Sequence, residues 1–160
     1  MNFVIRECTF DDVDYIYKLN CIEMGYDHPI ENTRKQLKMV LSSCRDIIYV
    51  AVLDEKIVGY VHANDYNLIY APPMKNIMGI AVSGEYKKIG IGKALLNAVE
   101  NWAKADGAKG VRLVSGATRK EAHEFYKRCG YCGGKQQLNF KKYFEESEGD
   151  EMYMKKELTF

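Results

Sequence analysis

A lysine- and glycine-rich stretch at the centre of the chain has the residue types that bind phosphate. The stretch Lys87-Lys88-Ile89-Gly90-Ile91-Gly92-Lys93 follows the apolar run Ile80-Ala81-Val82, and a helical pattern begins near Gly92. Free N–H groups at a helix start, together with the positive end of the helix dipole, bind anions, and glycines let the backbone come close. Residues 75–93 contain four lysines and one acidic residue. The sequence therefore predicts a polyanion site here.

The spacing in this stretch does not fit two common nucleotide-binding motifs. A Walker A loop needs glycine where Lys87 stands and serine or threonine where Ala94 stands. A dinucleotide fingerprint needs a third glycine where Leu95 stands. From these residues alone, a loop whose glycines only permit tight turns remains the alternative.

Two motifs together resemble signatures of the GNAT N-acetyltransferases. Lys87-x-x-Gly90-x-Gly92, after a strand ending in Ile80-Ala81-Val82, resembles the Q/R-x-x-G-x-G/A signature, whose amides hold the pyrophosphate of acetyl-CoA. Downstream, Ala122-x-x-Phe125-Tyr126-x-x-x-Gly130-Tyr131 is similar to the family's A-x-x-F-Y-x-x-x-G-F/Y helix. A helix and a strand separate the motifs, as in the family, and the resemblance covers nearly the whole chain.

The resemblance implies a fold and an activity. The fold is an α/β (α+β) single domain over residues 1–160, with a central mixed, mostly antiparallel sheet of about six or seven strands and about four helices. The activity is acetyl transfer from acetyl-CoA to a primary amine of a small molecule or protein, by direct attack. Tyr126 is expected to protonate the departing CoA thiolate, because Ala122 one turn away leaves room beside its hydroxyl. Glu23 is the candidate general base.

The expected binding residues come from the strand, the loop, the downstream helix and the first inter-helix loop. For acetyl-CoA they are Ile80, Ala81, Val82, Lys87, Lys88, Ile89, Gly90, Ile91, Gly92, Lys93, Ser115, Arg119, Ala122, Phe125 and Arg128. For the amine acceptor they are Tyr26, Asp27, His28, His62 and Asn64. Each acceptor candidate also has an ordinary structural interpretation, such as a solvated helix end or a satisfied strand histidine.

Three positions depart from the family pattern and leave an alternative open. Lys87 replaces the usual glutamine or arginine, Arg119 replaces an asparagine, and Asn76 stands where some relatives carry a catalytic glutamate. A non-catalytic acyl-CoA-binding sensor or regulatory module would account for Asn76. Nucleic-acid binding is disfavoured, since no aromatic residues alternate with the lysines of the loop.

Alternating helical and strand patterns surround the loop and must position it. Apolar spacing and turn residues predict a mixed sheet with helices between its central strands and hairpins at both ends. Strands are expected at 3–8, 47–53, 57–64, 76–82, 111–115, 135–143 and 152–158, and helices after Thr9, around 37–44, at 92–105 and at 119–129. The two C-terminal strands could pair across a homodimer.

Length and composition restrict the class of protein. The 160 residues are 47% hydrophobic with a net charge of +1, which fits one compact domain and gives no basic excess for nucleic acid. No apolar run is long enough for a transmembrane helix, and the first residues lack a signal-peptide pattern, so we expect a cytoplasmic protein without membrane contact. Cys129-x-x-Cys132 lacks the second half of a zinc site, so no metal is expected.

Overall fold

The computed structural model describes residues 2–142 and 144. The chain divides into two compact units, Met1–Gly116 and Ala117–Phe160. The first unit contains β1 (Val4–Glu7), a 3₁₀ turn (Phe10–Asp12), α1 (Val13–Met24), α2 (Ile30–Leu41), β2 (Asp46–Leu53), β3 (Lys56–Tyr66), β4 (Met74–Val82), a second 3₁₀ turn (Gly84–Tyr86), α3 (Ile91–Ala105) and β5 (Val111–Leu113). The second unit contains α4 (Lys120–Arg128).

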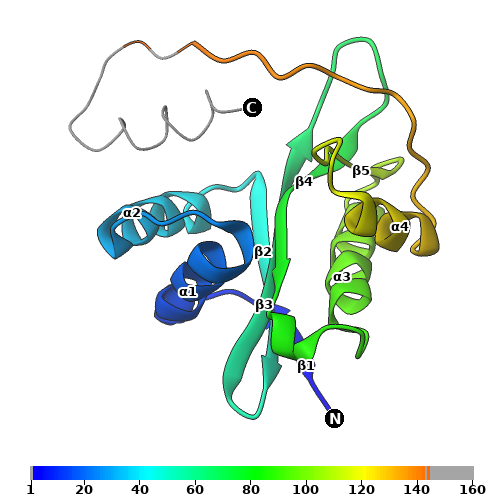
Figure 1. Ribbon diagram of the computed structural model, residues 1–160. Helices are drawn as coiled ribbons and strands as arrows, with labels where there is room; N and C mark the ends of the chain where they lie inside the picture. The colour runs from blue at the N-terminus through cyan, green and yellow to red at the C-terminus, as the bar shows by residue number, and fades with distance from the viewer. Residues whose placement is uncertain (1, 143, 145–160) are drawn as a thin grey trace. The chain divides into compact units, whose positions relative to one another are not determined.

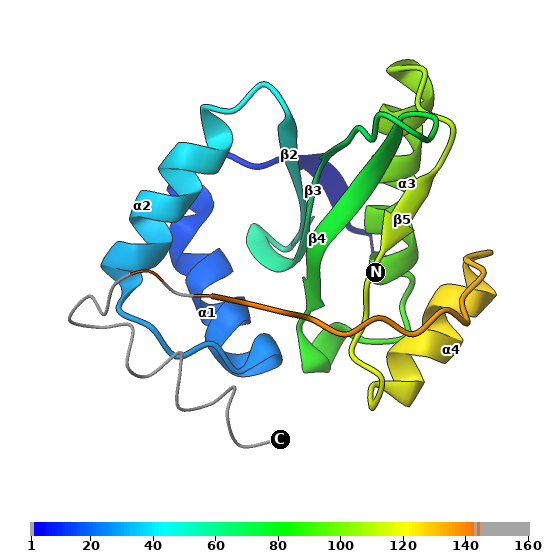
Figure 2. The ribbon, with the colours of Figure 1, turned by 90° about the horizontal axis from the view of Figure 1, so that it is seen from above.

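The first unit is an open five-stranded sheet with helices on both faces. The strand order is β1-β2-β3-β4-β5, and every pair is antiparallel except β4 with β5, which is parallel. Helices α1 and α2 lie on one face of the sheet and α3 lies on the other (Figures 1 and 2). This confirms the expected mixed, mostly antiparallel α/β fold, with five strands among the described residues instead of six or seven.

The β2–β3 hairpin shows how local chemistry sets the register of the sheet. Leu53 pairs with Lys56, so Asp54 and Glu55 form a two-residue turn, and their φ angles are +47° and +62°. Positive φ at both turn positions gives the turn a twist that matches the right-handed twist of the strands. The polar Asp-Glu-Lys sequence after the apolar run therefore forms the expected hairpin.

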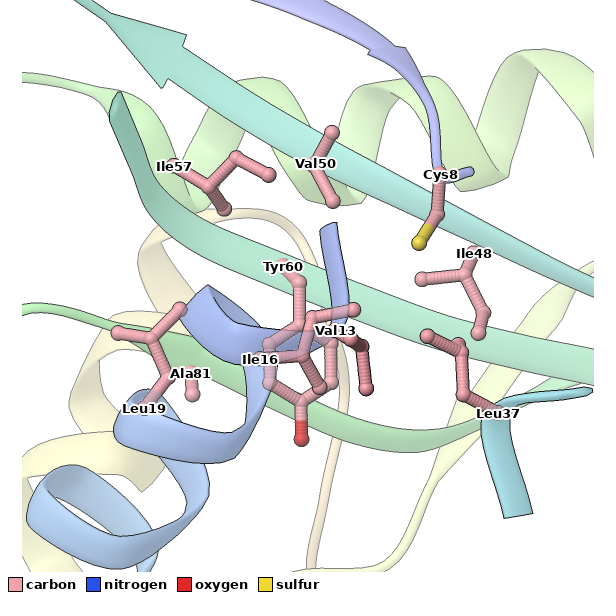
Figure 3. Close-up of a cluster of buried hydrophobic side chains, with 10 residues drawn as sticks. All are labelled: Cys8, Val13, Ile16, Leu19, Leu37, Ile48, Val50, Ile57, Tyr60 and Ala81. Atoms are coloured by element: carbon pink, nitrogen blue, oxygen red, sulfur yellow. The ribbon is translucent and has the colours of Figure 1, made fainter. Parts of the chain in front are cut away.

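A hydrophobic core fills the space between α1, α2 and the sheet (Figure 3). The side chains of the α1 residues Val13, Ile16 and Leu19 are at most 5% exposed. At the end of this core the Tyr60 hydroxyl donates a hydrogen bond to Asn20 Oδ1 at 2.5 Å, and burial raises the pKa of Tyr60 to about 12. The other members of the core are Cys8, Leu37, Ile48, Val50, Ile57 and Ala81.

A buried lysine joins the start of β4 to the end of α3 on the opposite face. Lys75 is 2% exposed, and its ammonium pairs with Asp65 at 2.5 Å and with Asp106. The ammonium also lies 3.8 Å from the centre of the Trp102 ring. A buried charge is tolerated only with such partners. Lys75 therefore shows that this position of β4 faces α3.

A bulge in β4 reverses the direction of its side chains. Ala63 pairs with Ile77 and His62 pairs with Gly79, so Met78 is an extra residue in β4. Lys75 faces α3 before the bulge, whereas Ala81 belongs to the core under α1 after it. Strict alternation would have put both residues on the same face. The bulge thus gives β4 residues on either side of Met78 different neighbours.

The prediction of a strand at 135–143 is wrong for the residues that the structure describes. Residues 135–142 contain no strand, and the side chains of Leu138 and Phe140 are 82% and 85% exposed. Two apolar side chains among polar ones bury too little surface to hold a strand that has no neighbouring strand to pair with. Residue 143 and the strand expected at 152–158 lie outside the described residues. No helix in the described part of the chain is long and apolar enough to cross a membrane.

Candidate active site

The C-terminal half of β4 has an unpaired edge. β5 pairs with β4 only from Lys75 to Ile77, so Met78–Val82 has no strand neighbour on that side among the described residues. Ser83 N–H donates to Val58 O at 2.8 Å, so this residue faces β3 with its backbone groups. Because successive residues of an antiparallel strand present these groups to opposite sides, Val82 and Ile80 present theirs at the open edge. This edge can pair with an extended ligand that contains amide groups.

The loop after β4 leads into an amide-rich helix start. The backbone turns through Lys88 and Gly90, whose φ angles are +67° and +96°, and α3 begins at Ile91. The first helical hydrogen bond runs from Ala94 N–H to Gly90 O at 3.0 Å, so the three preceding amides have no acceptor inside the helix. A Cβ added at Gly90 would meet no heavy atom within 4 Å, so the space there is open. Such a helix start fits a phosphate group.

Three exposed lysines surround this helix start. Lys87 lies 3.6 Å from Glu23 Oε2, whereas Lys88 and Lys93 have no carboxylate within ion-pair distance in the described chain. Two unpaired cations beside a helix N-terminus give the loop a positive field. The prediction of a polyanion site therefore has matching geometry, in which Ile80, Ala81 and Val82 lead directly into the loop.

Glu23 lies at the end of α1 and contacts the same loop. Its Oε1 accepts a hydrogen bond from Gly84 N–H at 2.7 Å, and its side chain is 17% exposed. With the Lys87 contact, both carboxylate oxygens face the segment that joins β4 to α3. Glu23 is thus placed beside the loop that follows β4, and it lies 61 residues before Gly84 in the chain.

The second unit carries the other expected catalytic residue on a short helix. Tyr126 belongs to α4 and is 9% exposed, with its ring centre 5.3 Å from that of Phe125 and 6.2 Å from that of Tyr131. Burial raises the pKa of Tyr126, against a smaller opposing effect of Arg119. The phenol is therefore protonated at neutral pH. Arg119 directly precedes α4. The other residues of this unit expected to bind acetyl-CoA are Ala122, Phe125 and Arg128, which lie on α4.

The expected acceptor residues fall into two groups in the first unit. Tyr26, Asp27 and His28 lie in the loop between α1 and α2, where the rings of Tyr26 and His28 are stacked with centres 6.3 Å apart. His62 and Asn64 lie on β3. These two strand residues belong to a larger polar arrangement that the sequence did not reveal.

A row of four polar residues crosses the sheet. Asp46 of β2 pairs with Asn64 of β3, Asn64 pairs with Asn76 of β4, and Asn76 pairs with Arg112 of β5. Because Lys75 faces α3, Asn76 and the rest of this row face the α1/α2 side of the sheet. We call Asp46, Asn64, Asn76 and Arg112 the polar row. Three of its members, Asp46, Asn76 and Arg112, were not expected as site residues.

Each end of the polar row is held by neighbouring side chains. Asp46 accepts from Ser43 Oγ at 2.5 Å and lies 2.8 Å from His62 Nε2. Burial favours a raised pKa for Asp46, but the hydrogen bonds from Ser43 and His62 outweigh it and hold the pKa below its ordinary value. At the other end, Arg112 donates to Asn76 Oδ1 at 2.5 Å. The only sequence signal for this end was a charged residue between Val111 and Leu113.

Comparisons with known proteins identify relatives of this chain. The model of the acetyltransferase (GNAT) family matches residues 13–131. An uncharacterized N-acetyltransferase of Methanocaldococcus jannaschii is 31% identical over 136 residues, which are 81% of this chain and 60% of that protein. An N-alpha-acetyltransferase of Sulfurisphaera tokodaii is 28% identical over 135 residues, 79% of this chain and 78% of that protein. This chain thus spans less than two thirds of the M. jannaschii relative.

Solved structures share the fold at lower sequence identity. The aminoglycoside N-acetyltransferase AAC(6')-Iy, solved in complex with CoA, superimposes with a TM-score of 0.80 at 16% identity. The superposition covers 88% of this chain and 95% of that one. Identity at this level shows a common fold and does not transfer the substrate.

Proposed function

The chain belongs to the acetyltransferase (GNAT) family, and on that premise we propose that it transfers the acetyl group of acetyl-CoA to a primary amine by direct attack. The observation that carries this proposal is the open edge of β4 leading into the lysine-rich start of α3. Acetyl-CoA has an amide-containing arm at one end and phosphates at the other. Along the chain, the open edge of β4 comes first and the lysine-rich start of α3 follows, which matches the order of the arm and the phosphates in acetyl-CoA.

The residues of this site fit acetyl-CoA as the co-substrate, which supplies an acetyl thioester. Ile80 and Val82 would bind the amides of its arm through backbone groups, with Ala81 between them. The amides at the start of α3 would hold the pyrophosphate, and Lys87, Lys88 and Lys93 would neutralise the phosphates. Ile89, Gly90, Ile91 and Gly92 complete the loop. We assign Ser115, Arg119, Ala122, Phe125 and Arg128 to the same co-substrate.

Two proton transfers accompany the reaction. The attacking amine forms the new C–N bond as the C–S bond breaks, and it gives up one proton. We propose that this proton reaches Glu23 through a water relay, because the Glu23 carboxylate contacts the loop after β4 and not the Ile77 end of the open edge. The leaving sulfur takes up one proton, for which Tyr126 is the proposed donor, and solvent then restores the Tyr126 proton. The phenol is protonated at neutral pH, as a proton donor must be, although burial raises its pKa and so makes it a weaker acid than an exposed tyrosine. No covalent bond to the enzyme is needed, so the cysteines need not take part.

The acceptor belongs to the class of primary amines, and its contacts are proposed to include Tyr26, Asp27, His28, His62 and Asn64. Relatives named N-alpha-acetyltransferase support a protein N-terminus as an acceptor to test. We further propose that residues 1–160 act as one acetyltransferase domain in the cytoplasm and that the protein forms a homodimer.

The experiment is an acetylation assay with a thiol readout. Purified protein is incubated with acetyl-CoA and, in turn, an amino acid, a peptide with a free N-terminus, a polyamine and an aminoglycoside. Release of free thiol with at least one amine, and a matching acetylated product by mass spectrometry, is the expected result. Binding of acetyl-CoA without thiol release in any arm would favour an acyl-CoA sensor instead.

Tyr126→Phe distinguishes the catalyst from the sensor. Loss of a general acid should lower kcat by about 10²- to 10⁴-fold while the Kd for CoA is retained. Tyr131→Phe is the matched control, because its ring contacts that of Tyr126 and it loses the same hydroxyl without the proposed role. Equal kcat values for the two variants would remove Tyr126 from the mechanism.

A further inference from the structure

The polar row points to the chemical class of the amine acceptor, an inference that rests on the proposed function. On the α1/α2 side of the sheet, Ile48, Val50 and Tyr60 are buried in the core. The polar row crosses the same side, where four neighbouring strands each contribute one polar residue. With adjacent strands about 4.8 Å apart, the row spans about 14 Å from Asp46 to Arg112. It is long enough to contact a small amine along its whole length.

The Arg112 end of the row lies where the reacting end of acetyl-CoA is expected. The phosphate loop follows Val82, so an arm paired with the open edge runs back along β4 toward Ile77. That distance is five residues, or about 16 Å. The open edge ends at Ile77, where pairing with β5 begins, and Arg112 is the β5 residue opposite Asn76. The acceptor amine must approach the thioester close to this junction.

Arg112 is fixed in place but has unused hydrogen-bond donors. Its guanidinium carbon lies 4.3 Å from the centre of the Tyr66 ring, and one nitrogen donates to Asn76 Oδ1. No carboxylate of the described residues lies within ion-pair distance of it, although the residue is half-buried. A guanidinium has five N–H donors in a planar fork that matches a carboxylate. Stacking and the Asn76 contact thus hold a fork with no anion of its own.

Asn64 supplies the complementary group beside this fork. Its Oδ1 is buried and has no hydrogen-bond partner among the described residues. Asn64 of β3 is directly opposite Asn76 of β4, which is itself opposite Arg112 of β5. The Asn64 side chain therefore lies on the same face of the sheet as Arg112, two strands away. A buried acceptor without a partner is costly and is satisfied when a ligand brings an N–H group.

From these two features we propose that Arg112 binds a carboxylate of the acetyl acceptor while Asn64 Oδ1 accepts a hydrogen bond from its amine. The preferred acceptors are amines that carry a carboxylate a few bonds away. A polycation such as an aminoglycoside brings only positive charge to the Arg112 end and is disfavoured there. The carboxylate belongs either to a free amino acid or to an acidic side chain at a peptide N-terminus.

The test compares acceptors with and without this charge. One arm compares L-amino acids with their carboxamides, and the other compares C-terminally amidated peptides that begin with Glu or with Gln. In at least one of these two arms, kcat/KM should be higher for the acceptor with the carboxylate by about tenfold to a hundredfold. This is the range expected for a hydrogen bond between charged groups. The arm that shows the preference identifies the source of the carboxylate.

Variants of Arg112 connect the preference to this residue. Arg112→Gln keeps a donor for Asn76 but removes the charge, so the carboxylate-to-carboxamide ratio should fall to about one. Arg112→Lys should restore part of the ratio. Arg45→Ala removes an exposed arginine in the segment before β2 and is the charge-matched control, which should keep the wild-type ratio. Melting temperatures establish that each variant is folded.

Two results would overturn the proposal. A wild-type protein that acetylates amines without preference in either arm refutes it and leaves the proposed function intact, as does an unchanged ratio in Arg112→Gln. If no amine is acetylated, calorimetry in the presence of CoA tests the proposal without turnover, by comparing the affinities of N-acetyl amino acids and their carboxamides. A carboxylate preference that disappears in Arg112→Gln supports the proposal, and equal affinities refute it.

Discussion

Gly90→Ala tests whether the loop after β4 holds the phosphates of CoA. Gly90 has φ of +96°, and a Cβ there meets no heavy atom within 4 Å, so the substitution strains the backbone without a steric clash. A residue other than glycine in this region costs about 1–2 kcal/mol. If the free loop relaxes to relieve this strain, binding must restore it. The Kd for CoA should then rise by about 5- to 30-fold.

Gly107→Ala is a matched control at the other end of the same helix. Gly107 follows α3 with φ of +74°, and its added Cβ also meets nothing within 4 Å. Gly107→Ala should keep its strain in the free protein, which lowers the melting temperature by about 2–4 °C per kcal/mol in a chain of this size. Gly90→Ala should lower the melting temperature less, because its free loop relaxes. Only Gly90→Ala should weaken CoA binding, because only Gly90 lies at the helix start that is proposed to hold the phosphates.

Isothermal titration calorimetry with CoA and with pantetheine separates the two ends of the ligand. Pantetheine has the amide arm but no phosphates, so Gly90→Ala should leave its affinity within about twofold, a difference below 0.5 kcal/mol. Equal CoA affinities for Gly90→Ala and Gly107→Ala would show that the loop is not the phosphate site. An equal loss for CoA and pantetheine would show that the substitution disturbs the edge of β4 instead.

Two further predictions concern Glu23 and the Arg6–Asp12 pair. Glu23→Gln keeps an acceptor for the Gly84 amide but cannot take a proton. The kcat should therefore fall by about 10²-fold or more while the Kd for acetyl-CoA is retained, as measured by steady-state kinetics and calorimetry. A change in Kd alone would assign Glu23 to positioning the loop. Asp12 is buried, which favours a raised pKa, but its hydrogen bonds with Arg6 outweigh burial and lower the pKa in the folded protein. The stability gained from this shift is present above the ordinary pKa of the carboxyl and is lost as pH falls through the lowered one. Asp12→Asn should therefore cost about 2 kcal/mol in urea unfolding near neutral pH and progressively less below about pH 4, and a gap independent of pH would contradict the assignment.

Features that depend on a short stretch of chain were predictable from the sequence. The turn at Asp54 and Glu55, the helix after Gly90 and the helix that carries Tyr126 all lie within about two residues of their expected positions. In each case the determining interactions are local: positive φ at a turn, a helix start and a repeating apolar face. The lysines and amides of the proposed phosphate site could be found for the same reason, since they are neighbours in the chain.

The strand expected at 135–143 shows where local patterns stop being sufficient. Its sequence alternates weakly, but a strand is stable only when another strand supplies its hydrogen bonds and a face to bury. Leu138 and Phe140 are exposed, so the segment has neither among the described residues. Whether a partner exists is a property of the whole sheet, and no window of sequence contains it.

By itself the sequence determined the chemistry available to this protein: a lysine- and glycine-rich helix start for a polyanion, and the two motifs of an acetyl-CoA-dependent family. Only the tertiary structure decided which side chains share a surface. The short pairing of β5 leaves the β4 edge open, and the bulge at Met78 reverses the faces of β4. The strand registers align Asp46, Asn64, Asn76 and Arg112. A register shift of one residue would send a strand's side chains to the opposite face, so the polar row exists only in the folded sheet.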